Sequence, residues 1–212
     1  MTDALRSAVA ARYGELAATS TSLSCGGAAE LASVRPGERC LDLGCGRGRD
    51  ALRLAELTGP EGHVIGVDLT PRMVEEARRT ATQAGAKHVE IALASLDATG
   101  LPAGSIDVVV SSCAVNHAPD KAAVWREVWR VLAPGGRFVV SDIYSLEDVP
   151  ARWRDDPTAV AECWAGAVRR DVYMSTLAES GFTDLQVLEE SAPYHRGAID
   201  LCKVTIAGRK SA

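Results

Sequence analysis

Short apolar runs alternate with longer amphipathic stretches in this sequence, and the alternation limits the folds that the chain can adopt. The apolar runs are rich in Val, Ile and Leu and lie at 39–44, 63–68, 89–95, 106–112 and 137–144. The stretches between them carry apolar residues at helical spacing, at 48–58, 71–84 and 120–132. Strands separated by helices form a mostly parallel sheet covered on both faces. The pattern therefore predicts an α/β fold with a mostly parallel central sheet and helices on both faces.

Further elements are predicted on either side of this core. The pattern favours helices at 2–18, 26–34, 157–167 and 171–180, and strands at 183–190 and 200–207. A length of 212 residues suits one α/β domain with a substantial core. We therefore expect a single domain over residues 1–212.

Composition and charge restrict the partners and the compartment. The net charge of −5 and the pI of about 5.4 argue against a surface built for nucleic acid or anionic membranes. No apolar run approaches the roughly 20 residues needed to cross a bilayer, and residues 1–10 lack the features of a signal peptide. We expect a cytoplasmic protein whose cysteines stay mostly reduced. These are Cys25, Cys40, Cys45, Cys113, Cys163 and Cys202.

A glycine-rich turn follows the first predicted strand, in the stretch "LDLGCGRGRD". Ligands of doubly wound sheets bind at the carboxyl ends of the strands, and Gly44, Gly46 and Gly48 lie at such an end. Glycines allow a ligand to lie against the backbone, and the amides that open the next helix attract an anionic group. Asp68 ends the second predicted strand, where its carboxylate can accept hydrogen bonds from both hydroxyls of a ribose.

Two ligands fit this combination, a nicotinamide dinucleotide and S-adenosylmethionine. A dinucleotide fingerprint is G-x-G-x-x-G/A, but Arg49 occupies the place of its last small residue, and the glycine spacing here is G-x-G-x-G. With Asp42 before the turn, "LDLGCGRG" resembles the first motif of class I S-adenosylmethionine-dependent methyltransferases. "LAPGGRFVVSD" at 132–142 resembles their fifth-strand motif. The resemblance implies a Rossmann-like class I methyltransferase fold with S-adenosylmethionine as cofactor.

In such enzymes the glycine turn accommodates the amino acid part of the cofactor, and the acidic residue of the second strand holds the ribose. The resemblance also implies a division of the domain into a helical cap (1–36), a cofactor-binding core (37–145) and a substrate-side segment with closing strands (146–212). The cofactor-binding residues that we expect are Asp42, Gly44, Cys45, Gly46, Gly48, Asp68, Leu69, Met73, Ser95, Leu96, Ser112 and Tyr13.

The adenine end of this expected site departs from the usual pattern. The third strand of these enzymes ends in an acidic residue, but here Ser95 takes that place and Asp97 follows two residues later. The Ser95 hydroxyl can accept the adenine hydrogen bond, and the amide of Leu96 can face the ring. Met73 either covers an adenine face or is plain core. Tyr13 either closes over the cofactor or is a half-exposed aromatic residue of an amphipathic helix.

A more specific resemblance follows the fourth predicted strand. The stretches "VIGVDLTPRMVEEAR", "VVVSSCAVNHAPDKAAVWREVWRVLAPGGR" and "AECWAGAV" are similar to the arsenite S-adenosylmethionine methyltransferases. That family carries a cysteine after the fourth strand, a second in an E-C-x-x-G-A segment, and a third in a C-G context upstream of the glycine motif. The matching residues are Cys113, Cys163 and Cys25. The chain has Ser112 where family members commonly have asparagine.

The resemblance implies methyl transfer to trivalent arsenic, a reaction of arsenic detoxification. Arsenic(III) is soft and thiophilic, and three pyramidal thiolates leave its lone pair free to face a methyl group. The implied partners are arsenic as the small-molecule substrate, free or as a thiol conjugate, and a thiol reductant. The wide spacing of Cys25, Cys113 and Cys163 shows no site by itself. The alternative to a role as arsenic ligand is that a cysteine is simply a buried apolar residue. This alternative is open for every cysteine, and it suits Cys40, Cys45 and Cys202.

Other functions stay open at this level. The same cofactor serves methyl transfer to an O, N, C or S centre of an organic metabolite, and a non-catalytic module that binds S-adenosylmethionine or senses a metalloid is a third hypothesis. Asn116 and His117 follow Cys113 on one predicted loop. The two side chains could contact the substrate or the sulfonium region of the cofactor. We expect the histidine to be solvated, as loop histidines usually are, and we assign it no role as a base.

Overall fold

The computed structural model describes residues 3–19, 27–197 and 199–212. Its central element is an eight-stranded sheet with the strand order β3-β2-β1-β4-β5-β8-β6, with β7 paired to β8. The strands are β1 (Arg39–Leu43), β2 (His63–Asp68), β3 (Val89–Leu93), β4 (Ile106–Ser112), β5 (Leu132–Ser145), β6 (Phe182–Glu190), β7 (Tyr194–Arg196) and β8 (Ile199–Lys210).

Strands β1 to β5 run parallel, and β8 joins β5 in the antiparallel direction. Leu41 of β1 stands opposite Ile65 on one side and Val109 on the other, and all three belong to the apolar centre of the sheet. Strands buried on both faces read as continuous apolar runs, which is why the sequence pattern revealed them. The predicted α/β fold, mostly parallel with helices on both faces, is confirmed.

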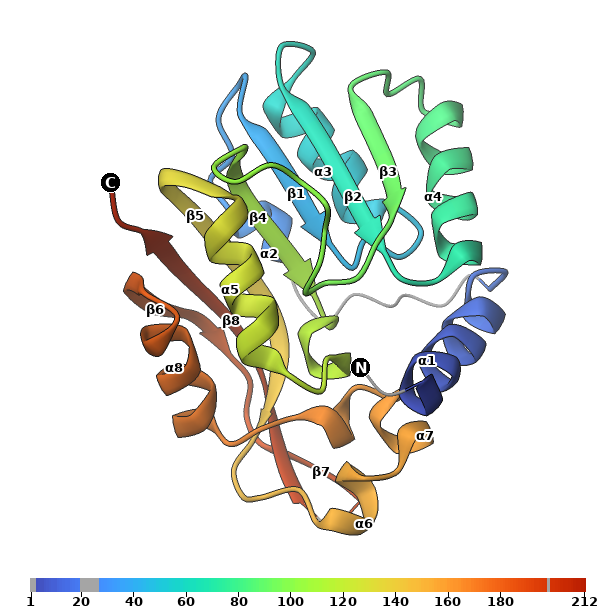
Figure 1. Ribbon diagram of the computed structural model, residues 1–212, viewed down its shortest axis with the longest axis vertical. Coiled ribbons are helices and arrows are strands. Elements are labelled where there is room, and N and C mark those ends of the chain that lie inside the picture. The colour runs from blue at the N-terminus through green and yellow to red at the C-terminus, as the bar shows by residue number, and fades with distance from the viewer. Residues whose placement is uncertain (1–2, 20–26, 198) are drawn as a thin grey trace.

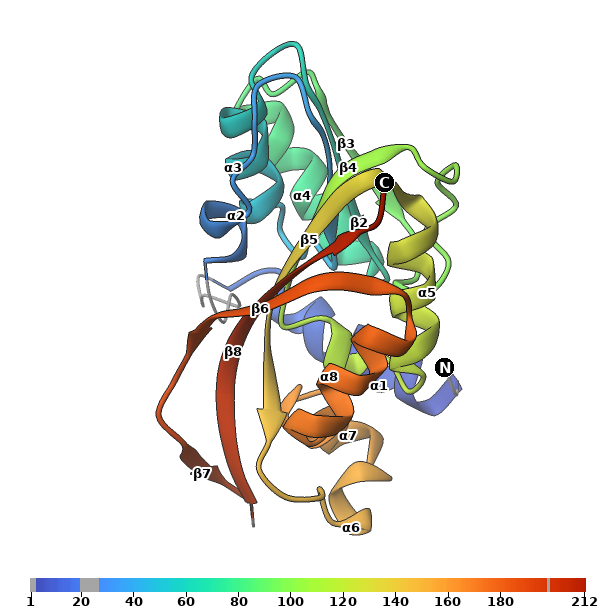
Figure 2. The same ribbon diagram turned by 90° about the vertical axis from the view of Figure 1, so that its left-hand side faces the viewer.

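Two helical layers cover the sheet, as Figure 2 shows from the side. The first packs through its alanines and leucines against one face, with α2 (Ala28–Leu31), α3 (Arg49–Thr58) and α4 (Pro71–Gln83). The second buries Trp125, Val128 and Tyr173 against the other face, with α5 (Lys121–Val131) and α8 (Arg170–Glu179). The strand order reverses between β1 and β4, so a crevice opens there at the carboxyl ends.

A third group of short elements closes that end of the sheet (Figure 1). It consists of α1 (Asp3–Leu16), η1 (Val115–His117), α6 (Ala151–Arg154), α7 (Pro157–Val160) and η2 (Trp164–Gly166). Val9 of α1 and Val160 of α7 belong to an apolar cluster with Trp164 and Leu201. This cluster holds the N-terminal helix over the crevice. In the described residues, no helix has both the length and the apolarity needed to cross a membrane.

Some element boundaries differ from the sequence prediction. The helix expected at 157–167 ends at Val160 and is followed by the separate turn η2. Gly166 lies so close to the next loop that a Cβ atom there would be 1.9 Å from the backbone oxygen of Asn116. The close contact requires glycine at this position, and Cys163, with a φ of +74°, interrupts the helical backbone between α7 and η2. The helix expected at 26–34 is reduced to 28–31, with residue 26 outside the described residues.

Candidate functional site

A pocket lies at the carboxyl ends of the parallel strands, beneath α1. It encloses about 780 Å³ of space, a volume that includes space open to solvent. Its walls come from the turns after β1, β2, β3 and β4. The lining residues are Val9, Tyr13, Gly44, Gly46, Asp68, Leu69, Thr70, Ser95, Leu96, Asp97, Ser112, Cys113, Ala114, His117, Ala118 and Pro119.

The glycine turn after β1 forms the floor of this pocket. Gly44 has a φ of +83°, and a Cβ atom on it would lie 2.4 Å from the Cβ of Ala114. Only glycine allows both the conformation and the close approach. The backbone N–H groups of Gly44 and Cys45 donate to the carbonyl of Val67, which fixes the turn against β2. The turn therefore presents bare backbone to the pocket.

Asp68 is held in place by the backbone around it. Its Oδ2 accepts a hydrogen bond from the N–H of Gly46 at 2.9 Å, and its Oδ1 accepts one from the N–H of Thr70 at 2.8 Å. Burial raises the pKa of Asp68, and these hydrogen bonds oppose that shift. A carboxylate oxygen has more than one acceptor direction. Both oxygens therefore remain able to accept hydroxyl groups of a ribose in the pocket.

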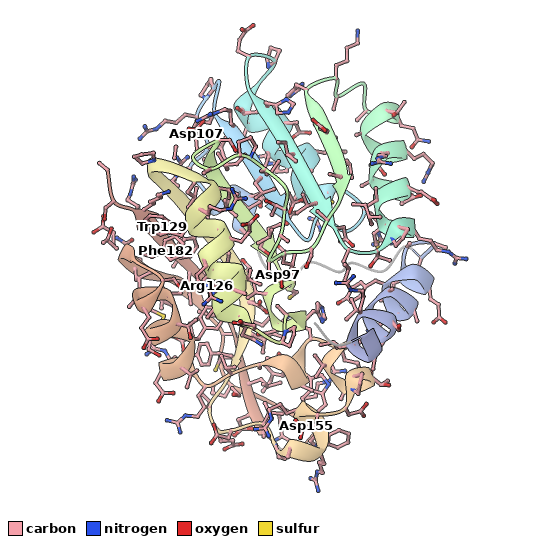
Figure 3. The ribbon with its side chains drawn as sticks, viewed as in Figure 1. Asp97, Asp107, Arg126, Trp129, Asp155 and Phe182 are labelled. Carbon is pink, nitrogen blue, oxygen red and sulfur yellow. The ribbon has the colours of Figure 1, made fainter. Side chains whose placement is uncertain are left out.

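The loop after β3 forms the far wall of the pocket. The Ser95 hydroxyl donates a hydrogen bond to Oδ1 of Asp97, and Leu96 lies between them on the pocket surface. Figure 3 shows Asp97 at the carboxyl-end edge of the sheet. The loop thus combines an apolar wall with a carboxylate, which suits the face and the amino group of a purine.

A hydrogen-bonded histidine joins α1 to the loop after β4. Nδ1 of His117 lies 3.1 Å from the carbonyl of Val160, which only accepts, so Nδ1 carries the proton. Nε2 then accepts from the hydroxyl of Tyr13 at 2.8 Å. Burial lowers the pKa of His117 to about 4, so the ring is neutral. The expectation of a solvated histidine was wrong, because α1 and α7 cover the loop.

Two cysteines and one aspartate meet beside the pocket. The Sγ atoms of Cys113 and Cys163 and a carboxylate oxygen of Asp142 all lie within 4.8 Å of one another, and all three residues are buried. The thiol of Cys163 donates to Oδ1 of Asp142 at 3.6 Å. Cys113 also lines the pocket, so the cluster adjoins it. Cys113 is disulfide-bonded in this structure, and its thiol chemistry belongs to the reduced protein.

The backbone at both cysteines is unusual. Cys113 has a φ of +53° and Cys163 a φ of +74°, a region that residues with a side chain seldom adopt. In the described residues, Ser33 and Asp184 are the other non-glycine residues with positive φ. Such conformations cost about 1–3 kcal/mol each and gather at functional sites. Their occurrence at both thiols of one cluster indicates a site rather than ordinary packing.

Burial also sets the protonation of the cluster. It raises the pKa of the Cys163 thiol well above its usual range, and the negative charge of Asp142 adds to this effect. It raises the pKa of Asp142 to about 6, while hydrogen bonding from the Ile143 amide and the charge of Lys121 act in the opposite direction. Burial lowers the pKa of Lys121. The Cys163 thiol is therefore protonated until a soft ligand displaces the proton.

Comparison with known proteins identifies relatives of this chain. The family described as "Methyltransferase domain" matches residues 35–187. An arsenite methyltransferase from Halobacterium salinarum is 39% identical over 165 residues, covering 78% of this chain and 42% of the relative. One from Aquipseudomonas alcaligenes is 37% identical over 164 residues, covering 73% and 46%.

A crystal structure of an arsenic(III) S-adenosylmethionine methyltransferase from Chlamydomonas reinhardtii superposes with a TM-score of 0.80 at 32% identity. The match covers 100% of this chain and 75% of that one. The chain belongs to the arsenite S-adenosylmethionine methyltransferase family. It spans less than half the length of the two curated arsenite methyltransferases described above.

In this member of the arsenite S-adenosylmethionine methyltransferase family, most residues expected to bind the cofactor line the pocket. They are Tyr13, Gly44, Gly46, Asp68, Leu69, Ser95, Leu96 and Ser112. The others lie behind the pocket wall. Asp42 is 1% exposed in β1, and Cys45 and Met73 are buried among apolar residues. Gly48 has a φ of +84° and begins α3, where a Cβ atom would press on Ala77.

Of the three cysteines matched to the arsenite S-adenosylmethionine methyltransferase family, the structure brings Cys113 and Cys163 together, and Cys25 lies outside the described residues. Cys40, Cys45 and Cys202 are buried and free, as the packing alternative expects. Sequence reasoning assigned no role to several pocket residues or to Asp142. The only signal for most of these residues is that they follow the ends of parallel strands, whereas Val9 lies in α1 and Asp142 lies within β5. The residues are Val9, Thr70, Asp97, Ala114, His117, Ala118, Pro119 and Asp142.

Proposed function

We propose that the protein transfers a methyl group from S-adenosylmethionine to trivalent arsenic held by cysteine thiolates. The observation that supports this most strongly is the convergence of Cys113 and Cys163, far apart in sequence, within 4.8 Å beside the pocket. Two buried sulfurs are donors for a soft metalloid and serve few organic acceptors. Membership of the arsenite S-adenosylmethionine methyltransferase family adds to the argument.

The groups that line the pocket suit the cofactor. Asp68 would accept the ribose hydroxyls, the turn from Gly44 to Gly48 would lie against the amino acid part, and the Ser95–Asp97 loop would hold the adenine. Tyr13 would cover the ligand from α1. When bound, S-adenosylmethionine supplies a methyl group on a positively charged sulfur, ready for displacement. The observed floor of bare backbone and the rigid Asp68 support this assignment.

The residues of the chain hold and orient the arsenic. Cys113 and Cys163 supply two thiolates, and Cys25 is the third ligand or a resolving thiol, with an added thiol as the alternative third ligand. Thiolates increase the electron density on arsenic and leave its lone pair free, so no general base is needed. In-line displacement requires alignment and exclusion of water. Cys113 lines the pocket, and the Tyr13–His117 hydrogen bond closes the covering helix over it.

Several finer expectations belong to the same proposal. The reaction requires reduced cysteines, so a thiol reductant is a partner, and a cytoplasmic location would keep the thiols reduced. Residues 1–36 act as the cap, 37–145 as the cofactor-binding core and 146–212 as the substrate-side segment. Together they form one domain over residues 1–212.

The test is arsenic speciation after incubation of the reduced protein with arsenite, a thiol and S-adenosylmethionine. Cys113→Ser and Cys163→Ser should each lose most of the methylated arsenic while they keep cofactor affinity, because a hydroxyl is not a soft donor. Cys25→Ser should be milder, and Cys202→Ser serves as the matched control in β8. Full methylation by a Cys113→Ser, Cys163→Ser double variant would contradict the proposal and favour an organic acceptor.

A further inference from the structure

The thiol cluster contains a carboxylate that the proposed methyl transfer does not use. Asp142 is 1% exposed in β5. Its Oδ1 accepts hydrogen bonds from the N–H of Ile143 at 2.8 Å and from the thiol of Cys163 at 3.6 Å. Its Oδ2 is buried and has no hydrogen-bond partner among the described residues. Buried carboxylates without partners are costly unless a cation or a metal compensates them.

We propose that Asp142 joins Cys113 and Cys163 in a binding site for a thiophilic divalent cation, with Zn²⁺ as the ion that fits best. Zinc binds thiolate sulfur and carboxylate oxygen in tetrahedral geometry, and sites with three protein ligands keep the fourth position open. The two sulfur donors disfavour Mg²⁺ and Ca²⁺, which take oxygen ligands. Cys113 lines the pocket, so the open fourth position would face it.

The distances in the cluster already approach those of a zinc site. With Zn–S bonds of about 2.3 Å and Zn–O bonds of about 2.1 Å, tetrahedral geometry places sulfur about 3.6 Å from oxygen and about 3.8 Å from the second sulfur. Sγ of Cys163 lies 3.6 Å from Oδ1 of Asp142. The three ligand atoms are all within 4.8 Å of one another. Side-chain rotations that move the ligand atoms by about 1 Å therefore complete the site.

The charges of the neighbouring groups also suit a divalent ion. Lys121 donates a hydrogen bond to the carbonyl of Ala118 at 3.1 Å, and its ammonium and the carboxylate of Asp142 attract each other. The site forms only after a phosphine or thiol reductant has cleaved the disulfide of Cys113. In that reduced protein the opposite charges of Lys121 and Asp142 balance while both thiols carry protons. When Zn²⁺ binds, two S–H bonds break, two Zn–S bonds form and two protons leave to solvent. The net charge of the buried cluster is then unchanged, and no electron is transferred.

The site has a regulatory consequence that rests on the proposed function. Zinc bound to Cys113 and Cys163 would occupy the thiolates that arsenic needs. Zn²⁺ would therefore inhibit methylation in competition with arsenite, and its chelation would restore activity.

The binding experiment uses the full chain reduced with a phosphine, which leaves no competing thiol in solution, and omits both arsenite and cofactor. Zn²⁺ is titrated against a chromophoric chelator, and the expected result is one ion per chain. Asp142→Asn should weaken zinc binding by about tenfold or more, in the range reported for groups that support a metal site. Asp184→Asn makes the same chemical change at an exposed position in β6 and should leave the affinity unchanged.

A second measurement separates ligand loss from misfolding. Cd²⁺ replaces Zn²⁺ as the probe, and its ultraviolet charge-transfer band from thiolate should lose intensity in Cys113→Ser and in Cys163→Ser, with near-ultraviolet circular dichroism recording the fold. Zinc affinity that is unchanged in Asp142→Asn, or in the double cysteine variant, would overturn the site. Zinc binding without arsenite methylation would contradict only the proposed function. Arsenite methylation without zinc binding would contradict only the proposed zinc site.

Discussion

The hydroxyl of Tyr13 in α1 donates a hydrogen bond to Nε2 of His117 at 2.8 Å, although the two residues are 104 positions apart. This contact ties the N-terminal helix to the loop that also carries Cys113. Further attachment comes from Arg47 in the glycine turn, whose guanidinium donates to the carbonyl of Leu16 at 3.4 Å. The helix over the pocket is thus bonded to two turns of the proposed cofactor site.

Removal of the Tyr13 hydroxyl should loosen this helix. Tyr13→Phe leaves the buried Nε2 of His117 without a donor, so we expect the free energy of unfolding to fall by about 1–3 kcal/mol. Urea denaturation of Tyr13→Phe, His117→Phe and the double variant would measure the coupling between the two side chains. Additive losses in the double variant would show that the hydrogen bond contributes nothing.

The buried His117 should make stability depend on pH. Its pKa is lowered by burial from 6.5 to about 4, so as pH falls below about 6.5 the unfolded chain takes up a proton that the folded chain refuses. The contribution of neutral His117 to the free energy of unfolding is present above pH 6.5 and is lost as pH falls toward 4. Between pH 7 and pH 5 the loss should be about 2 kcal/mol. The free energy of unfolding of His117→Gln should lack this part of the pH dependence. If the variant and the original protein show the same dependence of unfolding free energy on pH, the prediction is wrong.

Asp68 should contribute to cofactor affinity through its two oriented oxygens. Asp68→Asn keeps the size of the side chain but removes the charge and one acceptor, so S-adenosylmethionine binding should weaken by about 1.5–3 kcal/mol. Isothermal titration calorimetry would measure this, with Asp184→Asn as the exposed control. Equal affinities in the two variants would exclude Asp68 as the ribose ligand.

A side chain should be tolerated at Gly135, near the start of β5, but not at Gly44 in the glycine turn. Gly44→Ala combines a positive φ with a Cβ atom 2.4 Å from that of Ala114, whereas Gly135→Ala has a similar φ of +75° and open space around it. Both variants carry backbone strain, and only the first adds overpacking of about 1–3 kcal/mol. Thermal or urea unfolding should rank Gly44→Ala as the less stable variant. The reverse order would mean that the turn shifts freely.

The fold was predictable because the parallel strands are buried on both faces and read as apolar runs. The thiol cluster was less predictable, since the spacing between Cys113 and Cys163 does not require contact. Their approach accompanies the break between α7 and η2, where Cys163 adopts a φ of +74°. Periodicity records only local preferences, so it predicted a continuous helix there.

The sequence pattern also could not predict which polar residues are buried. His117 read as a loop residue because nothing nearby in sequence reveals that α1 and α7 cover it. Asp142 closes the quoted fifth-strand motif, yet its role depends on a thiol from a distant segment. The residues that line the pocket from strand ends were the easiest to anticipate, because the topology alone brings them together.

The positive φ angles of Cys113 and Cys163 have a consequence for how such chains evolve. Glycine would adopt both conformations without steric cost, so backbone strain alone favours replacement of either cysteine by glycine. Selection for sulfur must oppose that tendency at both positions. We expect chains with this sheet that have lost the chemistry of the site to drift toward glycine or asparagine there. The two backbone positions therefore offer a simple way to sort sequences by whether the thiols are still under selection.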